Sequence, residues 1–101
     1  MYKWSADELK YQIGKLFQLY RLRNKLSQLQ LGHELNLSAN HIGRIERAET
    51  NPTVEIVLEY CNFFLIDISI LFVKLTDRQL DDIEKEINNL KIENKNQSKK
   101  S

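Results

Sequence analysis

The chain has 101 residues, 42% of them hydrophobic, which fits one domain with a modest core. A single cysteine, Cys61, excludes an intramolecular disulfide, and the net charge of +1 argues against a protein that coats nucleic acid without specificity. The apolar runs are too short to span a bilayer, and the start of the chain lacks a signal-peptide pattern, so we expect a cytoplasmic protein without a membrane partner.

The sequence predicts an all-α fold, because apolar residues recur at helical spacing along most of the chain and no stretch alternates like a β-strand. The spacings Ser5–Glu8 and Thr76–Gln79 are those of capping boxes, which open the first and last helices. With their caps, the six expected helices cover residues 5–24, 27–35, 39–47, 53–64, 68–73 and 76–92.

The most informative segment is residues 28–46, QLQLGHELNLSANHIGRIE, which predicts two short helices joined by a tight turn. The apolar residues at helical spacing are Leu31, Leu35, Ile42 and Ile45. Gly32 is expected where the two helices cross, because a side chain there would push them apart. Asn36 tolerates the positive φ that such a turn often needs, and Ser38 is a suitable N-cap for the second helix. This pattern is typical of a helix-turn-helix that presents its second helix to DNA.

Segments on both sides extend this pattern. They are Ile13-Gly14, Leu26-Ser27-Gln28, Arg44-Ile45-Glu46-Arg47, Asn51-Pro52-Thr53 and Ile68-Ser69-Ile70-Leu71-Phe72. Together with the motif they resemble the Cro/C1-type helix-turn-helix regulators, also called the XRE or phage-repressor family, over residues 13–73. The resemblance implies a five-helix domain that binds double-stranded DNA, formed here by residues 1–75.

The resemblance also implies which residues meet DNA. The helix over residues 39–47 would enter the major groove, where Asn40 can bond an adenine edge and Arg44 can grip a guanine. His41 would reach a base or a phosphate, and Ala39 would contact a thymine methyl or permit close approach. The other DNA-binding candidates, at helix starts and along the phosphate strand, are Lys25, Gln28, Ser38, Arg47 and Asn51.

Family members pair an arginine of the first helix with a glutamate at the end of the recognition helix, and Arg21 and Glu46 match these positions. The resemblance therefore implies a structural ion pair that orients the recognition helix. Gly43 costs about 0.5–1 kcal/mol relative to alanine inside a helix and is a candidate for close approach of a phosphate backbone. Lys25 and Ala48 replace glycines that family members often carry at turns, which weakens the turn chemistry.

The last predicted helix lies outside the resemblance and is assigned residues 76–93. Its apolar residues are spaced as in a two-heptad seam: Leu80, Ile83, Ile87 and Leu90. We expect the seam to meet extra leucines of the first helix, namely Leu16, Leu19 and Leu22. The contact is expected across a homodimer, with packing inside one chain as the alternative. Residues 94–101 are polar and lysine-rich and are expected to be disordered.

The charges are distributed unevenly along the chain. Residues 1–50 carry eight Lys and Arg against five acidic residues, a net +3, whereas residues 77–93 carry a net −3. A small basic region on a nearly neutral chain suits a sequence-specific dimer more than a non-specific coat. With the resemblance, this implies a homodimeric transcriptional regulator, with repression its expected role, acting on an approximately palindromic DNA site.

Three alternatives stay open at this point. The same DNA-binding domain serves in antitoxins, where the last helix would bind a toxin, and in controller proteins of restriction–modification systems. A helical protein-interaction module without DNA binding is disfavoured by the donors on the recognition helix. The sequence contains no catalytic constellation and no metal-ligand cluster, so we expect no enzyme, no cofactor, no metal ion and no small-molecule ligand.

Overall fold

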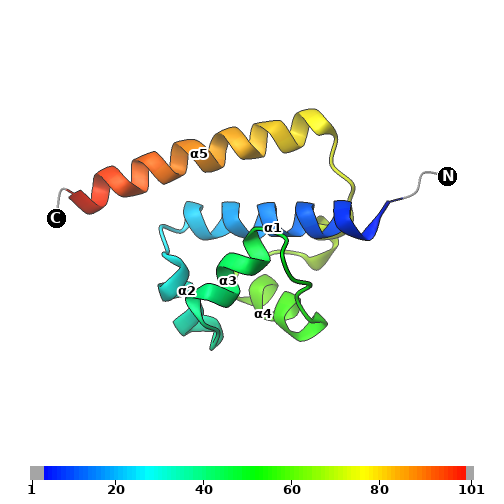
Figure 1. The fold of residues 1–101 in the computed structure, drawn as a ribbon, viewed down its shortest axis with the longest axis horizontal. Helices are drawn as coiled ribbons and strands as arrows, with labels where there is room; N and C mark the ends of the chain where they lie inside the picture. Colours follow the sequence, from blue (N-terminus) through cyan, green and yellow to red (C-terminus); the bar gives the residue numbers. More distant parts are fainter. Residues whose placement is uncertain (1–3, 100–101) are drawn as a thin grey trace.

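Six helical segments in series make up the computed structural model, which describes residues 4–99, with side chains through residue 96 (Figure 1). They are α1 Ala6–Arg23, α2 Gln28–Leu35, α3 Ala39–Glu46, α4 Val54–Phe64, the 3-10 helix η1 Ile68–Phe72 and α5 Asp77–Lys99. The described residues contain no strand, so the prediction of an all-α fold is confirmed. None of the described helices combines the length and apolar character that a membrane span needs.

The helix starts follow from side chains that cap them. Ser5 and Glu8 form a capping box at α1, and Thr76 and Gln79 form one at α5, as predicted. At α3, Ser38 Oγ accepts a hydrogen bond from the His41 backbone N–H, which satisfies one of the donors that a helix N-terminus leaves free. Local chemistry therefore decides where these helices begin.

Four non-glycine residues take a positive φ in the turns. Asn36, which was expected to do so, ends α2 at φ 58°. Lys25 and Ala48, at φ 58° and 60°, occupy the positions where the resemblance stated above would lead one to expect glycine, and Leu65 ends α4 at φ 58°. For residues other than Gly and Asn this conformation costs about 1–2 kcal/mol, so the turns at Lys25, Ala48 and Leu65 form despite unfavourable residues.

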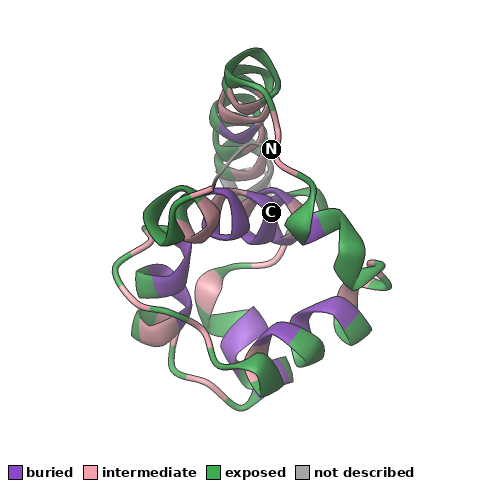
Figure 2. Ribbon diagram, turned by 90° about the vertical axis from the view of Figure 1, so that its right-hand side faces the viewer, coloured by how far each residue is buried: buried purple, intermediate pink, exposed green. Residues whose placement is uncertain are grey.

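The main core lies between α1, α2, α3, α4 and η1. Phe17 and Tyr60 stack at its centre with ring centroids 3.9 Å apart. The other fully or nearly fully buried apolar side chains of this core include Leu31, Ile42, Ile45, Cys61 and Leu71. Figure 2 shows that buried and exposed stretches alternate along the helices. The amphipathic stripes read from the sequence thus form one continuous core.

Two glycines allow the backbones of neighbouring elements to touch. A Cβ on Gly14 of α1 would lie 2.6 Å from the Ile45 carbonyl oxygen of α3. A Cβ on Gly32 would lie 2.3 Å from the Leu37 carbonyl oxygen, so the close approach there is to the α2–α3 turn. Gly32 was expected at a helix crossing; Gly14 occupies that kind of position instead.

Helix α5 lies along the opposite side of α1 from the main core (Figure 1). Ile87 is fully buried against Leu19 and Leu22, and Ile83 and Leu90 pack against the same small cluster. Leu80 is half-buried and lines a surface hollow with Trp4 and Tyr11. The structure thus shows the alternative arrangement, in which the seam packs within one chain, and the contact across a dimer stays a prediction.

The end of α5 also differs from the prediction. The helix continues to Lys99, into the segment over residues 94–101 that was expected to be disordered; the last two residues lie outside the described part. No glycine or proline interrupts this stretch, and Asn94 Nδ2 donates a hydrogen bond to the Leu22 carbonyl oxygen of α1 at 3.2 Å.

Candidate nucleic-acid interface

Helix α3 presents a polar face outward from the core. Ile42 and Ile45 are fully or almost fully buried, so the side chains on the opposite face of the helix are directed to solvent. Asn40 and Arg44 are exposed, and His41 is half-buried. The structure therefore brings the candidates for base contact onto one accessible face, with amide and guanidinium donors available for hydrogen bonds.

Two of the smaller candidates are engaged in the fold itself. Ser38 is exposed, but its hydroxyl oxygen caps α3 by accepting from the His41 N–H at 3.0 Å. Ala39, the first residue of α3, is half-buried. Both lie at the start of the helix, where a side chain of larger size would hinder close approach of another surface.

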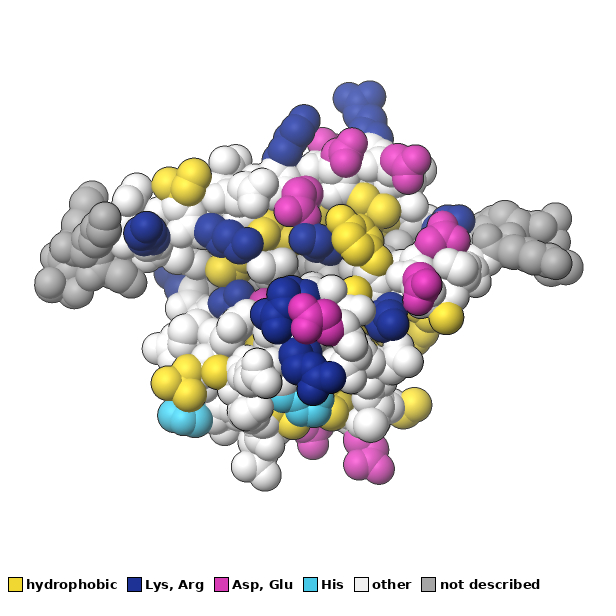
Figure 3. All heavy atoms as spheres, in the orientation of Figure 1, with side chains coloured by type: hydrophobic (Ala, Val, Ile, Leu, Met, Phe, Trp, Pro, Cys, Tyr) yellow, Lys and Arg dark blue, Asp and Glu magenta, His cyan; other side chains and the backbone are white. Residues whose placement is uncertain are grey.

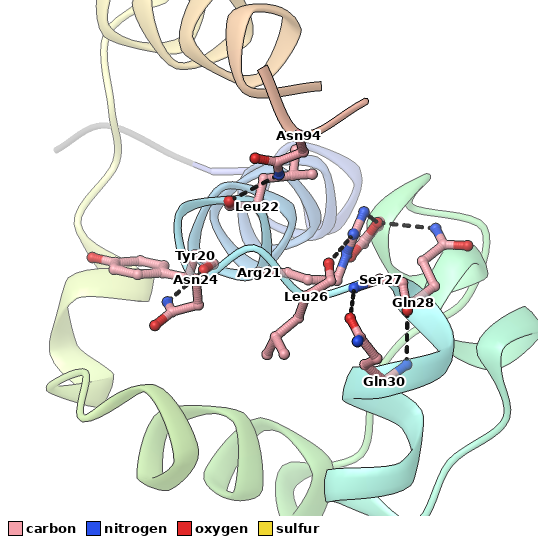
Figure 4. Close-up of polar contacts among 10 residues, drawn as sticks. Tyr20, Arg21, Leu22, Asn24, Leu26, Ser27, Gln28, Gln30 and Asn94 are labelled. Carbon is pink, nitrogen blue, oxygen red and sulfur yellow. Dashed lines mark hydrogen bonds and ion pairs between the residues drawn. The ribbon is translucent and has the colours of Figure 1, made fainter. Parts of the chain in front are cut away.

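A buried network holds the end of α3 on α1. Arg21 Nε donates to Glu46 Oε2 at 2.6 Å and Arg21 Nη2 donates to Glu46 Oε1 at 3.0 Å, with both side chains almost fully enclosed. Arg21 Nη1 also donates to the Leu26 carbonyl oxygen at 2.7 Å. This bidentate geometry fixes α3 relative to α1 and to the start of α2 (Figure 4).

Gln28 extends this network from α2. Its Nε2 donates to Glu46 Oε1 at 3.1 Å (Figure 4), while its amide oxygen accepts no hydrogen bond from the residues that the structure describes. A Cβ on Gly43 would lie 3.3 Å from Gln28 Nε2 and 2.8 Å from Arg47 Nη1. Gly43, which the sequence suggested for approach of a phosphate backbone, thus makes room for side chains of this chain.

Arg47 is exposed but paired with an acidic neighbour. Its guanidinium donates to both carboxylate oxygens of Glu49, and these hydrogen bonds lower the pKa of the Glu49 carboxyl from its ordinary value. Because both groups are exposed, the pair is easily broken by water or by a competing anion. Arg47 can therefore exchange Glu49 for a phosphate at little cost.

The remaining candidates lie at two different places. Lys25, which is exposed, and Gln28 both line a hollow at the start of α2. Asn51 is exposed in the loop before α4 and borders an apolar hollow of about 300 Å³ between α1, α4 and η1. We call this the η1 hollow; its exposed apolar rim includes Val54, Ile68 and Phe72. Asn51 is thus the one candidate here with apolar surroundings.

Two of the acidic residues of α5, Glu84 and Glu86, help to hold α5 on α1. Lys15 pairs with Glu84 at 2.7 Å, and Arg23 makes two hydrogen bonds to Glu86 at 2.6 and 2.8 Å. Sequence reasoning noticed that one half of the chain is basic and α5 acidic, but it did not pair them. These contacts withdraw Lys15 and Arg23 from the basic charge available to another molecule.

The face drawn in Figure 3 carries both histidines, which belong to α2 and α3, together with a broad spread of Lys and Arg side chains. Lys91 and Lys95, in the C-terminal half of α5, are also exposed. Sequence reasoning had assigned this part of the chain to dimer contacts, to a toxin contact or to a disordered tail. The described residues hold no group of three His, Cys, Asp or Glu that could bind a metal ion. The arrangement is suited to hydrogen bonding and to binding an anionic partner.

Comparison with known proteins places this geometry in a family. The model of a family described as Helix-turn-helix, the Cro/C1 or XRE type, matches residues 17–71. This match covers more than half of the chain and includes α2, α3 and the buried pair. Searches among curated proteins and among solved structures gave no match.

Proposed function

The chain belongs to the Cro/C1-type helix-turn-helix family of DNA-binding transcriptional regulators, and from this premise we propose that it binds one specific duplex sequence as a homodimer and represses transcription. Helix α3 would lie in the major groove, the position in which a recognition helix of this motif reads base edges. The polar N-terminus of α2 would lie over the phosphate backbone beside it.

The observation that carries this proposal is the exposed polar face of a rigidly held α3. Asn40 and Arg44 project from a helix whose other face is buried and whose end is fixed by the Arg21–Glu46 pair. Rigid placement matters because bidentate contacts, from Asn to adenine and from Arg to guanine, need exact alignment. His41 and Ala39 would complete the base-facing surface.

The contacts to the DNA backbone would come from residues around α3. Gln28 retains an unused amide oxygen and Lys25 stands beside it, while Arg47 would exchange Glu49 for a phosphate. Asn51 and the start of α3 at Ser38 would lie along the same strand. Such contacts set the register of the protein on DNA and carry no sequence information.

A homodimer would place two copies of α3 on half-sites about one helical turn, roughly 34 Å, apart. Since the α5 seam packs on α1, the surface that supports pairing with a second copy is the η1 hollow with its exposed apolar rim. Exposed apolar patches rimmed by polar groups often mark such contacts. The DNA site should accordingly be an approximate palindrome.

The proposal is tested by selecting bound duplexes from a random pool with the purified chain at near-physiological salt. We expect one two-fold symmetric motif to be enriched, and Arg44→Gln to abolish the preference at one base-pair position in each half-site while costing roughly ten- to hundredfold in affinity. Lys85→Gln, on an exposed position of α5, is the control that removes the same charge. Failure to enrich any motif, or an unchanged motif with Arg44→Gln, would contradict the proposed role of α3.

A further inference from the structure

A second basic surface lies beside the start of α2. A groove of about 690 Å³ runs between the α1–α2 turn, the first turn of α2 and the C-terminal half of α5. Three lysines line it, Lys25 from the turn and Lys91 and Lys95 from α5, and none of the residues lining it is acidic. We call it the α2–α5 groove.

The three lysines are not neutralised within the chain. Among the side chains that the structure describes, the ion pairs involve other bases, and Arg21, which also lines the groove, is neutralised by Glu46. Lys25, Lys91 and Lys95 are all exposed. The groove therefore concentrates positive charge that the fold does not use.

The fold holds the lysines of α5 in place. Lys91 and Lys95 are one helical turn apart, and Asn94 between them donates its hydrogen bond to the Leu22 carbonyl oxygen at 3.2 Å. Figure 4 shows Asn94 above the end of α1, with Ser27 and Gln28 on the side where α2 begins. One helical turn before Lys91, the hydrophobic cluster around Ile87 holds α5 against α1. These lysines thus stand on a docked helix.

The groove adjoins the proposed DNA surface. Gln28 and Ser27, at the start of α2, line it directly, and the basic side chains in Figure 3 continue from the centre of the face toward the end where α5 finishes. A phosphate strand that passes the N-terminus of α2 would therefore run on toward Lys91 and Lys95. Flexible ammonium groups suit such a strand, because they bind phosphates as point charges without strict geometry.

We propose that the α2–α5 groove is a second DNA contact, in which Lys25, Lys91 and Lys95 bind backbone phosphates that flank the base pairs read by α3. This inference rests on the proposed function, which it deepens by making α5 part of the DNA-binding surface. The contact would add affinity and salt dependence without sequence preference, because it meets phosphates only.

The test compares the double variant Lys91→Gln/Lys95→Gln with Arg78→Gln/Lys85→Gln, which removes the same charge from residues of α5 outside the groove. Affinity is measured over a range of salt for the selected duplex with long flanks and for the same duplex trimmed to its half-sites. For the groove variant we expect a loss on the order of ten- to hundredfold on the long duplex and a salt slope lower by about two per bound chain.

For the wild type, trimming the flanks should weaken binding, whereas for the groove variant it should change little. Lys91→Arg/Lys95→Arg should restore the wild-type slope, which excludes misfolding as the cause. The inference is overturned if the groove variant behaves like the control on both duplexes, or if it loses affinity by the same factor on both. In that case an enriched motif that depends on Arg44 still supports the proposed function. If the wild type binds no duplex in a salt-dependent way, the proposed function itself fails.

Discussion

Glu46 is the residue on which the position of the recognition helix depends. Its carboxylate accepts from Arg21 on α1 and from Gln28 on α2, so three helices meet at one buried charge. A buried pair of this kind adds little net stability when intact, but loss of one partner leaves the other charge buried without compensation. The pair therefore acts mainly on geometry, and loss of either partner alone should be strongly destabilising.

We expect Glu46→Gln to lower the free energy of unfolding by about 3 kcal/mol, measured by urea denaturation of the purified chain. The matched control is Glu49→Gln, which removes an exposed carboxylate three positions beyond the end of α3 and should change stability by less than about 0.5 kcal/mol. Equal midpoints for the two variants would show that the Arg21–Glu46 pair is not buried in solution.

Tyr60 offers the opposite case, a polar atom that costs stability. Its ring stacks on Phe17, and its buried hydroxyl has no hydrogen-bond partner among the described residues. Burial raises the pKa of this hydroxyl above its ordinary value, because the charged form would be poorly solvated. The ring of Tyr60 thus contributes to packing in the core, whereas its hydroxyl adds no stabilising hydrogen bond.

Tyr60→Phe should leave the melting temperature unchanged or raise it, by the equivalent of up to about 1 kcal/mol, because it removes an unsatisfied group and keeps the stacked ring. Phe17→Leu, which removes the other ring of the stack, should destabilise the chain and serves as the comparison. A clear loss of stability with Tyr60→Phe would mean that the hydroxyl finds a partner in solution.

At the scale of elements, α5 is attached to α1 by apolar and charged contacts together. Ile87 is enclosed between Leu19 and Leu22, and the Arg23 guanidinium binds the Glu86 carboxylate. The linker before α5 is held by Gln12, whose Nε2 donates to the Leu71 and Val73 carbonyl oxygens and whose Oε1 accepts from the Leu75 N–H. This buried amide fixes the path of the chain from η1 into α5.

The attachment of α5 should weaken in acid. Hydrogen bonds from Arg23 lower the pKa of Glu86 below its ordinary value of 4.5. Because the folded pKa lies below the unfolded one, the pair stabilises the fold fully above about pH 4.5, and its contribution is lost as the pH falls through the folded value. The contribution is below about 1 kcal/mol, since both side chains are partly exposed.

The direct measurement is an NMR titration of the Glu86 carboxyl carbon. In Arg23→Gln the pKa should return toward its ordinary value, whereas in Lys85→Gln it should stay near that of the wild type. An equal Glu86 pKa in the two variants would show that Arg23 does not bind Glu86 in solution.

At the scale of the whole molecule, the η1 hollow is the apolar surface proposed for pairing with a second copy. Val54 on its rim is 81% exposed, so changing this side chain should not disturb the core. Val54→Glu should weaken self-association at least tenfold in sedimentation, because it would bury an unpaired charge in the contact. Ile92→Glu, on the exposed side of α5, should leave association unchanged.

Two results of that experiment would contradict the surface assigned here. Equal association of both variants would show that copies meet elsewhere. A wild-type chain that stays monomeric at high concentration would show that the hollow is not a contact between two copies.

The sequence alone determined the features that depend on local chemistry. Ser5, Ser38 and Thr76 marked helix starts because a cap acts within three residues, and Asn36 marked the left-handed turn because few residues tolerate it. The spacing of apolar residues indicated which face of each helix is buried. The ion pair between Arg21 and Glu46 was expected only through the family resemblance, since nothing local joins residues so far apart.

Only the tertiary structure decided what covers each face and where each charge finds its partner. An apolar stripe has no preference for a particular surface, so the seam of α5 was equally suited to α1 and to a second copy. Contacts between helices distant in sequence likewise decide which groups lie beside Gln28, Gly43 and Lys91. The hydrophobic effect is non-directional, and the identity of the partner follows from the path of the whole chain.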